Sequence, residues 1–246
     1  MKSKSLSLTL AGLLILLSLA ACSGSAQGTQ ASGPPGNPIA PGPALAPATS
    51  AAPEPAGSDA VHIKAGNAAL DAGDLSKAEA EFKAALAANP GAAAAQLGLG
   101  NVYDRQARYA EAATALQAAI KLDPGLVAAH TNLGVAYYQQ QQFTEAMDQY
   151  KAALALQPDD PDTLYLEAVV YLQQHDLAAA QPLLEQVEQI KPDLPEVYYG
   201  LGVLYQLKGD KAQAITNFKK FLSLGQKAQD PTSIQHAQQE LQALQK

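Results

Sequence analysis

The sequence predicts an all-α protein, a solenoid of five helix pairs followed by one capping helix. The first observation is a proline that recurs every 34 residues, at Pro90, Pro124, Pro158 and Pro192. A period of this length corresponds to two antiparallel helices with their turns, which is one unit of a helical repeat array. The second observation is composition, because Ala, Leu, Gln and Lys dominate the C-terminal three quarters of the chain and Trp is absent. This composition favours helix over sheet.

The charge and cysteine content of the chain limit its chemistry. The 246 residues carry a formal charge of −7 at pH 7. No basic stripe is present that would displace counterions from phosphates, so we expect no nucleic-acid partner. Because Cys22 is the single cysteine, the chain forms no intramolecular disulfide.

Residues 1–21 are predicted to be a signal peptide. Two lysines, Lys2 and Lys4, precede an uncharged apolar run from Leu6 to Leu19. The run is short and wrongly flanked for a bilayer span, but it suits the apolar region of an export signal. The sequence therefore indicates that the protein is exported.

The end of the export signal, Leu19-Ala20-Ala21-Cys22, resembles the lipobox of bacterial lipoproteins. The resemblance implies that the Cys22 thiol is diacylglycerated and that the acyl chains anchor the protein to the membrane of the cell envelope. It also implies that Ser23 favours the outer membrane if the cell has one, and otherwise the outer face of the cytoplasmic membrane. The alternative is ordinary signal-peptidase cleavage, which would leave Cys22 as an exported free thiol.

Residues 22–58 are predicted to form a disordered tether behind the acylated cysteine. Their composition is almost wholly Ala, Pro, Gly, Ser and Thr, which cannot bury enough apolar surface to offset chain entropy. Fully extended, such a segment reaches on the order of 100 Å, so the folded part would lie away from the membrane. A proline-rich ligand or an O-glycosylated stretch is the alternative interpretation.

The prolines fix the register of the repeats. Placing each proline at position 32 of a unit gives five intervals without insertion: 59–92, 93–126, 127–160, 161–194 and 195–228. The pattern resembles the tetratricopeptide repeat (TPR) family, and the third unit shows it best, with Leu133-Gly134, Tyr137, Ala146, Tyr150, Ala153 and Pro158. The resemblance implies a right-handed superhelix in which the first helices of the units line a concave, peptide-binding groove.

The turns, the fourth unit and the C-terminus have features of their own. Gly73-Asp74 and Gly209-Asp210 are expected to make a turn and a helix N-cap, and Asp176 a cap without glycine. Pro182 falls inside a second helix, where it would bend the solenoid or act as a hinge. Residues 229–246 are predicted to be the capping helix, with an apolar stripe formed by Ile234, Ala237, Leu241 and Leu244. Binding of a partner is the alternative role of that stripe.

No residue pattern predicts an active site, a metal or a cofactor. The four histidines, His62, His130, His175 and His236, fall in different units and turns and do not converge on one ion. The acidic run Asp159–Asp162 suits a helix N-terminus better than a calcium loop. Nucleotide-binding, esterase and metalloprotease motifs are also missing. We therefore predict that the protein is not an enzyme.

Residues left over from the repeat pattern predict the binding groove. Three tyrosines on first helices are not explained by the packing positions, and one further position of each first helix is shared by valines or asparagines. The predicted groove residues are Asn67, Asn101, Val135, Tyr138, Tyr165, Val169, Tyr199 and Val203. Aromatic anchors among polar groups resemble a binding hot spot, whereas the alternative is that these side chains cover their own neighbours. Family members that clamp a C-terminal carboxylate use lysines with such asparagines, but Ile63 and Leu97 stand at the corresponding places.

Taken together, the sequence predicts a membrane-anchored scaffold that binds a peptide or a partner helix in the groove. Two alternatives stay open. The chain resembles the pilotin lipoproteins that assist type IV pilus assembly, which are also lipidated helical-repeat proteins. It could equally be an accessory subunit of a peptidoglycan or lipid enzyme.

Overall fold

A computed structural model describes residues 57–224 and 231–245, and these ranges contain eleven α-helices and no strand. The predicted signal peptide, Cys22 and nearly all of the predicted tether lie outside the described residues. The first helices of the five units are α2 (Ser58–Asp71), α4 (Ala93–Arg105), α6 (Val127–Gln139), α8 (Pro161–Gln173) and α10 (Pro195–Lys208). The second helices are α3 (Leu75–Ala88), α5 (Tyr109–Leu122), α7 (Phe143–Leu156), α9 (Leu177–Ile190) and α11 (Lys211–Leu224), and α12 (Pro231–Leu244) follows.

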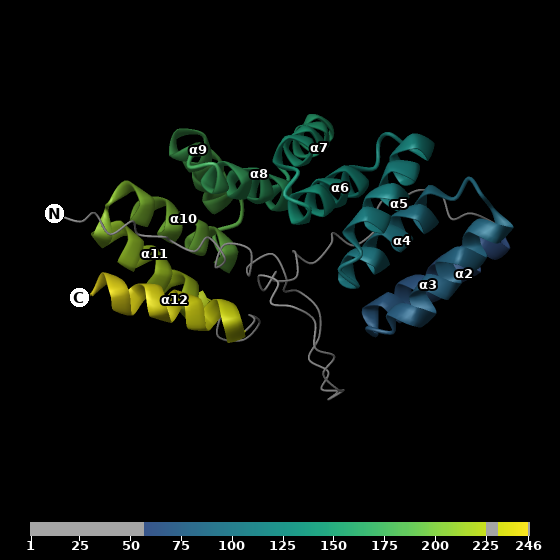
Figure 1. Ribbon diagram of the computed structural model, residues 1–246, viewed down its shortest axis with the longest axis horizontal. Helices are drawn as coiled ribbons and strands as arrows, with labels where there is room; N and C mark the ends of the chain where they lie inside the picture. The colour runs from purple at the N-terminus through teal and green to yellow at the C-terminus, as the bar shows by residue number, and fades with distance from the viewer. Residues whose placement is uncertain (1–56, 225–230, 246) are drawn as a thin grey trace.

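The helices form a curved stack of antiparallel pairs. Each first helix packs against the second helix of its own unit, and each second helix packs against the next unit. Figure 1 shows the pairs following one another along an arch, with α6 and α8 on its inner side and α7 and α9 on its outer side. The predicted all-α solenoid is confirmed.

Aspartates begin several of the helices, as the sequence predicts. The Asp74 carboxylate accepts a hydrogen bond from the Lys77 backbone N–H at 3.0 Å, and Asp176 accepts one from Ala179 at 3.1 Å. Such N-caps satisfy backbone donors that have no partner within the first turn of a helix.

Each turn between the two helices of a unit uses one residue in the left-handed conformation. These residues recur every 34 positions: Gly73, Ala107, Gln141, His175 and Gly209, with φ between 57° and 78°. Glycine adopts this conformation without steric cost, whereas the other three residues do not. The middle three units therefore hold a strained residue where the two end units use glycine.

Glycines on first helices make room for large side chains from the second helices. A Cβ added to Gly134 would lie 2.4 Å from the Tyr150 ring, and one added to Gly98 would lie 2.3 Å from Phe82. Phe82 also lies against Gly66 of its own unit, so one ring fills the space between two units. Close approach of the backbone to a ring is therefore what these glycines provide.

Two helices of the C-terminal half, α9 with its internal proline and the terminal α12, are each continuous. α9 runs without interruption from Leu177 through Pro182 to Ile190. The terminal helix α12 covers the end of the array, because Ala237 is fully buried and Leu241 and Leu244 pack against the core. The apolar stripe of α12 therefore serves as the predicted cap.

Candidate functional site

The first helices α6 and α8 lie on the inner side of the arch (Figure 1). We use the term inner face for one side of the first helices, which we define by positions 2, 5, 9, 12 and 13 of each 34-residue unit. At 100° per residue, these positions span an arc of about 100° on one side of the helix. In the third unit they are Ala128, Thr131, Val135, Tyr138 and Gln139.

Neighbouring first helices are also joined by buried polar side chains. The Asn132 amide donates a hydrogen bond to the Asn101 side-chain oxygen at 2.9 Å, which joins α6 to α4. The Thr131 and Thr163 hydroxyls are 2.8 Å apart, which joins α6 to α8. The side-chain oxygen of Asn101 therefore already has a partner within the protein, while Asn67, at the same position of the first unit, is half-buried.

The three tyrosines do not form the exposed aromatic stripe that the sequence predicts. Their side chains are almost inaccessible, with Tyr138 2%, Tyr165 4% and Tyr199 0% exposed. Each ring packs against a neighbouring element. Tyr199 contacts the Phe218 and Phe221 rings at centroid distances of 5.5 and 5.3 Å.

The other two tyrosines are covered in the same way. Tyr165 of α8 reaches to 3.3 Å from the place where a Cβ on Gly200 of α10 would lie. Tyr138 packs on Phe143 at a centroid distance of 5.5 Å. The interpretation of these rings as open anchors is wrong, because the absence of a side chain at Gly200 and the aromatic residues of the second helices let the rings pack inside the array.

The predicted groove valines divide into two groups. Val135 and Val169 are buried, whereas Val203 is half-buried. Of the eight predicted residues, only Asn67 and Val203 therefore keep a substantial accessible surface.

Polar atoms without partners mark the inner face, and sequence reasoning missed most of them. Among the residues that the structure describes, seven buried side-chain atoms lack a hydrogen-bond partner: Asp104 Oδ1, Tyr138 Oη, Gln139 Nε2 and Oε1, Tyr165 Oη, Gln173 Oε1 and Glu196 Oε2. All of them belong to first helices, and all occupy positions 2, 5, 12 or 13 of their units. Buried polar groups in proteins are normally paired, so this row calls for an explanation. The signal available in the sequence was position 12 of the unit, where the second unit has the acidic residue Asp104 and the third unit has Tyr138.

Two family models described as tetratricopeptide repeat match the chain. One matches residues 63–127 and 101–161, and the other matches residues 171–231, together more than half of the sequence. The chain belongs to the tetratricopeptide repeat family. No curated protein matches this chain.

Several solved structures superpose on much of the array. The crystal structure of MamA protein is 27% identical, with 69% of this chain and 92% of that chain covered and a TM-score of 0.58. YrrB, described as a TPR protein with an unusual peptide-binding site, is 22% identical over 72% of this chain and 90% of its own, with a TM-score of 0.56. PilW, described as a widely conserved type IV pilus biogenesis factor, is 19% identical over 76% of this chain and 89% of its own, with a TM-score of 0.66. The latter two likenesses concern the fold.

The electrostatics of the inner face of this TPR array centre on Asp104. Burial raises the pKa of the Asp104 carboxyl to about 7, although the neighbouring Arg105 lowers it. The Arg105 guanidinium itself donates to the Leu70 carbonyl oxygen at 2.7 Å. The guanidinium of Arg105, the residue next to Asp104, therefore bonds to a backbone oxygen and not to the Asp104 carboxylate.

A second acidic site lies on the inner face at the start of α10. Burial raises the pKa of Glu196, Lys191 lowers it, and Asp162 raises it. Lys191 lies 3.8 Å from the Asp162 carboxylate, a long contact between half-exposed groups. This part of the face is therefore acidic but has a cation nearby.

The histidines of the array are engaged in separate contacts. His62 Nδ1 lies 2.7 Å from Glu81 Oε2, and His130 bonds Gln149 and the Pro124 carbonyl oxygen. His236 Nδ1 lies 2.6 Å from the Tyr199 hydroxyl, which ties α12 to α10. Within residues 57–224 and 231–245, no cluster of three or more potential metal ligands occurs, and no helix is long and apolar enough to cross a membrane.

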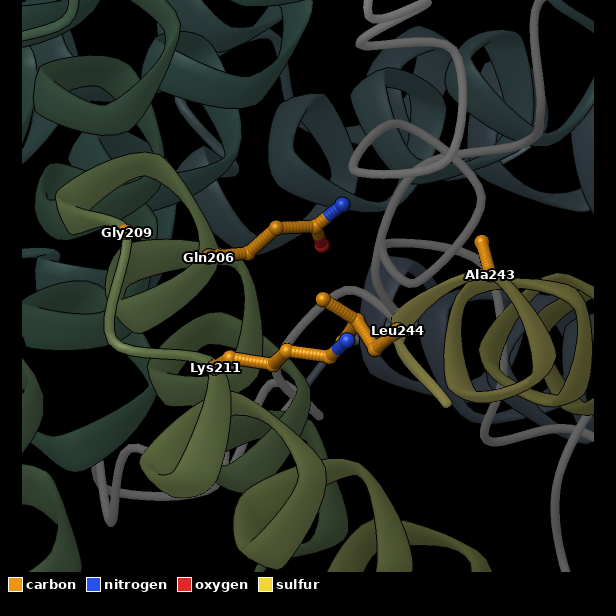
Figure 2. A pocket seen from close by; sticks show the side chains of 5 residues that line it. All are labelled: Gln206, Gly209, Lys211, Ala243 and Leu244. Carbon is orange, nitrogen blue, oxygen red and sulfur yellow. The ribbon is translucent and has the colours of Figure 1, made fainter. Parts of the chain in front are cut away.

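A small pocket lies away from the predicted residues, where the end of α12 meets the turn between α10 and α11. Gln206, Gly209, Lys211, Ala243 and Leu244 line a volume of about 150 Å³. Figure 2 shows the Lys211 and Leu244 side chains extending toward one another at this place. The pocket is too small for a drug-sized ligand.

Proposed function

We propose that the protein is a membrane-anchored TPR scaffold that binds a peptide or a partner helix on its inner face. The observation that carries the proposal is the match to the tetratricopeptide repeat family, because stacked helical repeats form extended surfaces that bind other proteins. The repeat fold is typical of non-catalytic scaffolds, so no reaction is assigned to the chain itself.

A fold relative supports this use of the array. YrrB is described as having an unusual peptide-binding site, and it covers 72% of this chain at 22% identity. The likeness supports peptide binding by an array of this shape and transfers no residue.

Site-specific photo-crosslinking in the native cell tests the scaffold proposal. Benzoylphenylalanine is placed at Asn67 or Val203, the accessible predicted residues of the inner face, and at Thr144 or Asp148, exposed residues of the outer helix α7. We expect adducts with a protein partner from the inner positions only. Adducts from the outer positions alone would place the binding surface elsewhere and sink the proposal.

The membrane anchor is proposed from the sequence Leu19-Ala20-Ala21-Cys22. Cells are fed an alkyne analogue of palmitate, and the protein is recovered from the membrane fraction. The wild-type chain should carry the label and Cys22→Ser should not. An unlabelled wild-type chain in the soluble exported fraction would contradict lipidation.

A role in type IV pilus assembly is a second candidate function. It is motivated by the lipobox pattern together with the fold likeness to PilW, whose TM-score is 0.66. Deleting the gene should then abolish twitching motility, and re-expression should restore it. The crosslinked partner separates this role from that of an accessory subunit, since a pilus component or an envelope enzyme would be identified directly by mass spectrometry.

A further inference from the structure

Exposed apolar residues recur where the second helices end. Leu122, Leu156, Ile190 and Leu224 are the last residues of α5, α7, α9 and α11, and each follows the one before it by 34 residues. They are 44, 47, 42 and 39% exposed, and they are four of the five large hydrophobic residues that are exposed in the described part of the chain. We call this row the apolar edge. Single exposed leucines are common on protein surfaces, but a row at one position of the repeat is the kind of apolar surface that marks an interaction site.

The core of the array does not account for the apolar edge. Two positions earlier on the second helices, Ile120, Leu154 and Leu222 are partly buried and pack against the core. The residues of the apolar edge come after them, at the helix end, where a polar residue with good helix propensity would serve the helix equally well. The first unit has Ala88 at the same position, so the row of large side chains begins in the second unit.

The apolar edge lies at the end of the array where the N-terminal segment enters. The two helices of a unit are antiparallel, so each second helix ends beside the start of its own first helix. In the first unit, the Asn89 amide, just after α3, donates a hydrogen bond at 2.7 Å to the Asp59 carboxylate in the first turn of α2. Val61, also at the start of α2, is the fifth exposed hydrophobic residue, at 69%. Gly57 therefore joins the array to the preceding segment at the same end as the apolar edge.

The segment that precedes the array matches the apolar edge in chemistry. Residues 23–53 carry no charge, and Ile39 and Leu45 are the two large apolar residues of the predicted tether. Both belong to the proline-rich stretch 37–48, whose composition favours a polyproline II helix. Such a helix has three residues per turn, so two residues that are six positions apart lie on the same side of it, about 19 Å from one another.

The spacing and the length of this segment also fit the apolar edge. Because α6 packs against both α5 and α7, the axes of α5 and α7 are separated by at most two packing distances of about 8–10 Å each. The spacing of about 19 Å between Ile39 and Leu45 therefore suits contacts with Leu156 and Leu122. In the same conformation, the chain from Leu45 to Gly57 spans up to roughly 37 Å, which is enough to reach the second unit from the start of α2.

We propose that residues 37–48 dock on the apolar edge of their own chain as a polyproline II segment, with Leu45 on Leu122 and Ile39 on Leu156. Because the segment is linked to the array, its effective concentration at the edge is on the order of millimolar, so weak contacts are sufficient. Docking leaves residues 23–36 as the free part of the tether and brings the array closer to the proposed membrane anchor. The contact does not depend on what the inner face binds.

Photo-crosslinking of the full chain in the native cell tests this contact. Benzoylphenylalanine replaces Ala155, an exposed residue next to Leu156, or Thr144, an exposed residue near the opposite end of α7. We expect mass spectrometry to find a crosslink within one chain from position 155 to residues 37–48. Position 144 should give no crosslink to this segment.

Matched serine variants separate docking from mere proximity of the tether. Ile39→Ser combined with Leu45→Ser should lower the yield of the crosslink at least ~10-fold, because two apolar side chains lose their burial. Ala44→Ser combined with Ala46→Ser, which changes the neighbours of Leu45, should leave the yield unchanged. Leu122→Ser, at an exposed helix end, should lower the yield several-fold with the helix content unchanged.

Three results would overturn the docking of the tether. They are a crosslink from position 155 to another protein or a second copy alone, the absence of any crosslink from this position, and a yield that Ile39→Ser combined with Leu45→Ser does not change. The first result would assign the apolar edge to another occupant. None of them affects crosslinking from Asn67 or Val203, so the proposed function is tested separately.

Discussion

The two halves of the array are stabilised by different chemistry on one backbone plan. In the first two units the buried core consists mainly of alanines with a few leucines, and Phe82 is its one fully buried aromatic ring in the described helices α2–α5. From the third unit onward the core is aromatic, with Tyr150, Tyr198, Tyr199, Phe218 and Phe221 fully buried. The TPR register fixes where a side chain packs, and the residue chosen there decides how strongly.

Charged side chains tie the alanine-rich units together. The Glu79 carboxylate of α3 accepts hydrogen bonds from Lys83 at 2.6 Å and from Arg108 at 3.2 Å, and Gln106 also donates to it. The Arg108 guanidinium lies 4.2 Å from the centroid of the Tyr103 ring. The alanine-rich units thus use a polar network to join α3 to the following unit. The aromatic half uses packing between rings instead.

The largest expected effect is loss of an aromatic ring from the C-terminal core. Phe218→Ala should destabilise its unit by roughly 3–5 kcal/mol, because the ring is fully buried against Tyr199 and Gly202. Hydrogen exchange reports the two halves separately, and protection should fall first in α10, α11 and α12. Phe218→Leu is the control and should lose far less.

The contrast between the halves fails if Ala113→Gly, which removes a single methyl group from the alanine-rich core, lowers protection as much as Phe218→Ala does.

The second effect in size is the pH dependence set by Asp104. Its pKa is about 7 in the folded chain against 3.8 in the reference state. Between these values the unfolded chain releases a proton that the folded chain keeps, so the free energy of unfolding falls as pH rises through this window. The cost of the buried charge is fully present above pH 7, where it amounts to at most roughly 4 kcal/mol. Asp104→Asn should remove this cost, because burial raises the pKa of the nearby Tyr109 and Tyr150 hydroxyls, so both stay protonated up to pH 8.

Urea unfolding at pH 5, 6, 7 and 8 measures the difference. Asp104→Asn should be more stable than wild type at pH 8, and the gap should close toward pH 4. Asp148→Asn should show no such trend. Parallel stability curves for wild type and Asp104→Asn would contradict the burial of an unpaired carboxylate.

Features that depend on neighbours along the chain could be predicted from the sequence, whereas the burial of single side chains could not. The 34-residue proline period placed every helix pair, and Asp74 and Asp176 were predicted as caps because capping depends on neighbours along the chain. The tyrosine interpretation failed at Tyr165 because exposure depends on the next unit, where Gly200 leaves room for the ring. Asp104 was not predicted, because the burial of its carboxyl depends on the three-dimensional structure rather than on the sequence of α4 alone.

A smaller effect is expected from the polar network of the first half. Glu79→Gln should lower the melting temperature at low salt by an amount equivalent to about 1 kcal/mol, because the Glu79 side chain is only partly exposed and contacts two cations. Raising NaCl from 50 to 500 mM should shrink the difference, since salt screens such pairs. Glu145→Gln, an exposed change in α7, is the matched control. A loss of stability that is independent of salt would mean that packing, and not charge, joins these units.

The smallest effect concerns the strained turns of the three middle units. Ala107 has φ of 57°, a conformation that costs an L-residue about 1 kcal/mol, while Gly73 and Gly209 take it freely. Ala107→Gly relieves this strain but also loosens the unfolded chain, so the net gain should be below about 1 kcal/mol. The reverse change, Gly73→Ala, meets no atom within 4 Å, so it should lose stability through backbone strain and not through a clash, while the stiffer unfolded chain offsets part of the loss. Thermal unfolding of both variants measures the free-energy cost of the left-handed conformation, which Ala107→Gly removes and Gly73→Ala introduces. A higher melting temperature in both variants would show that strain in this turn does not distinguish the middle units from the end units.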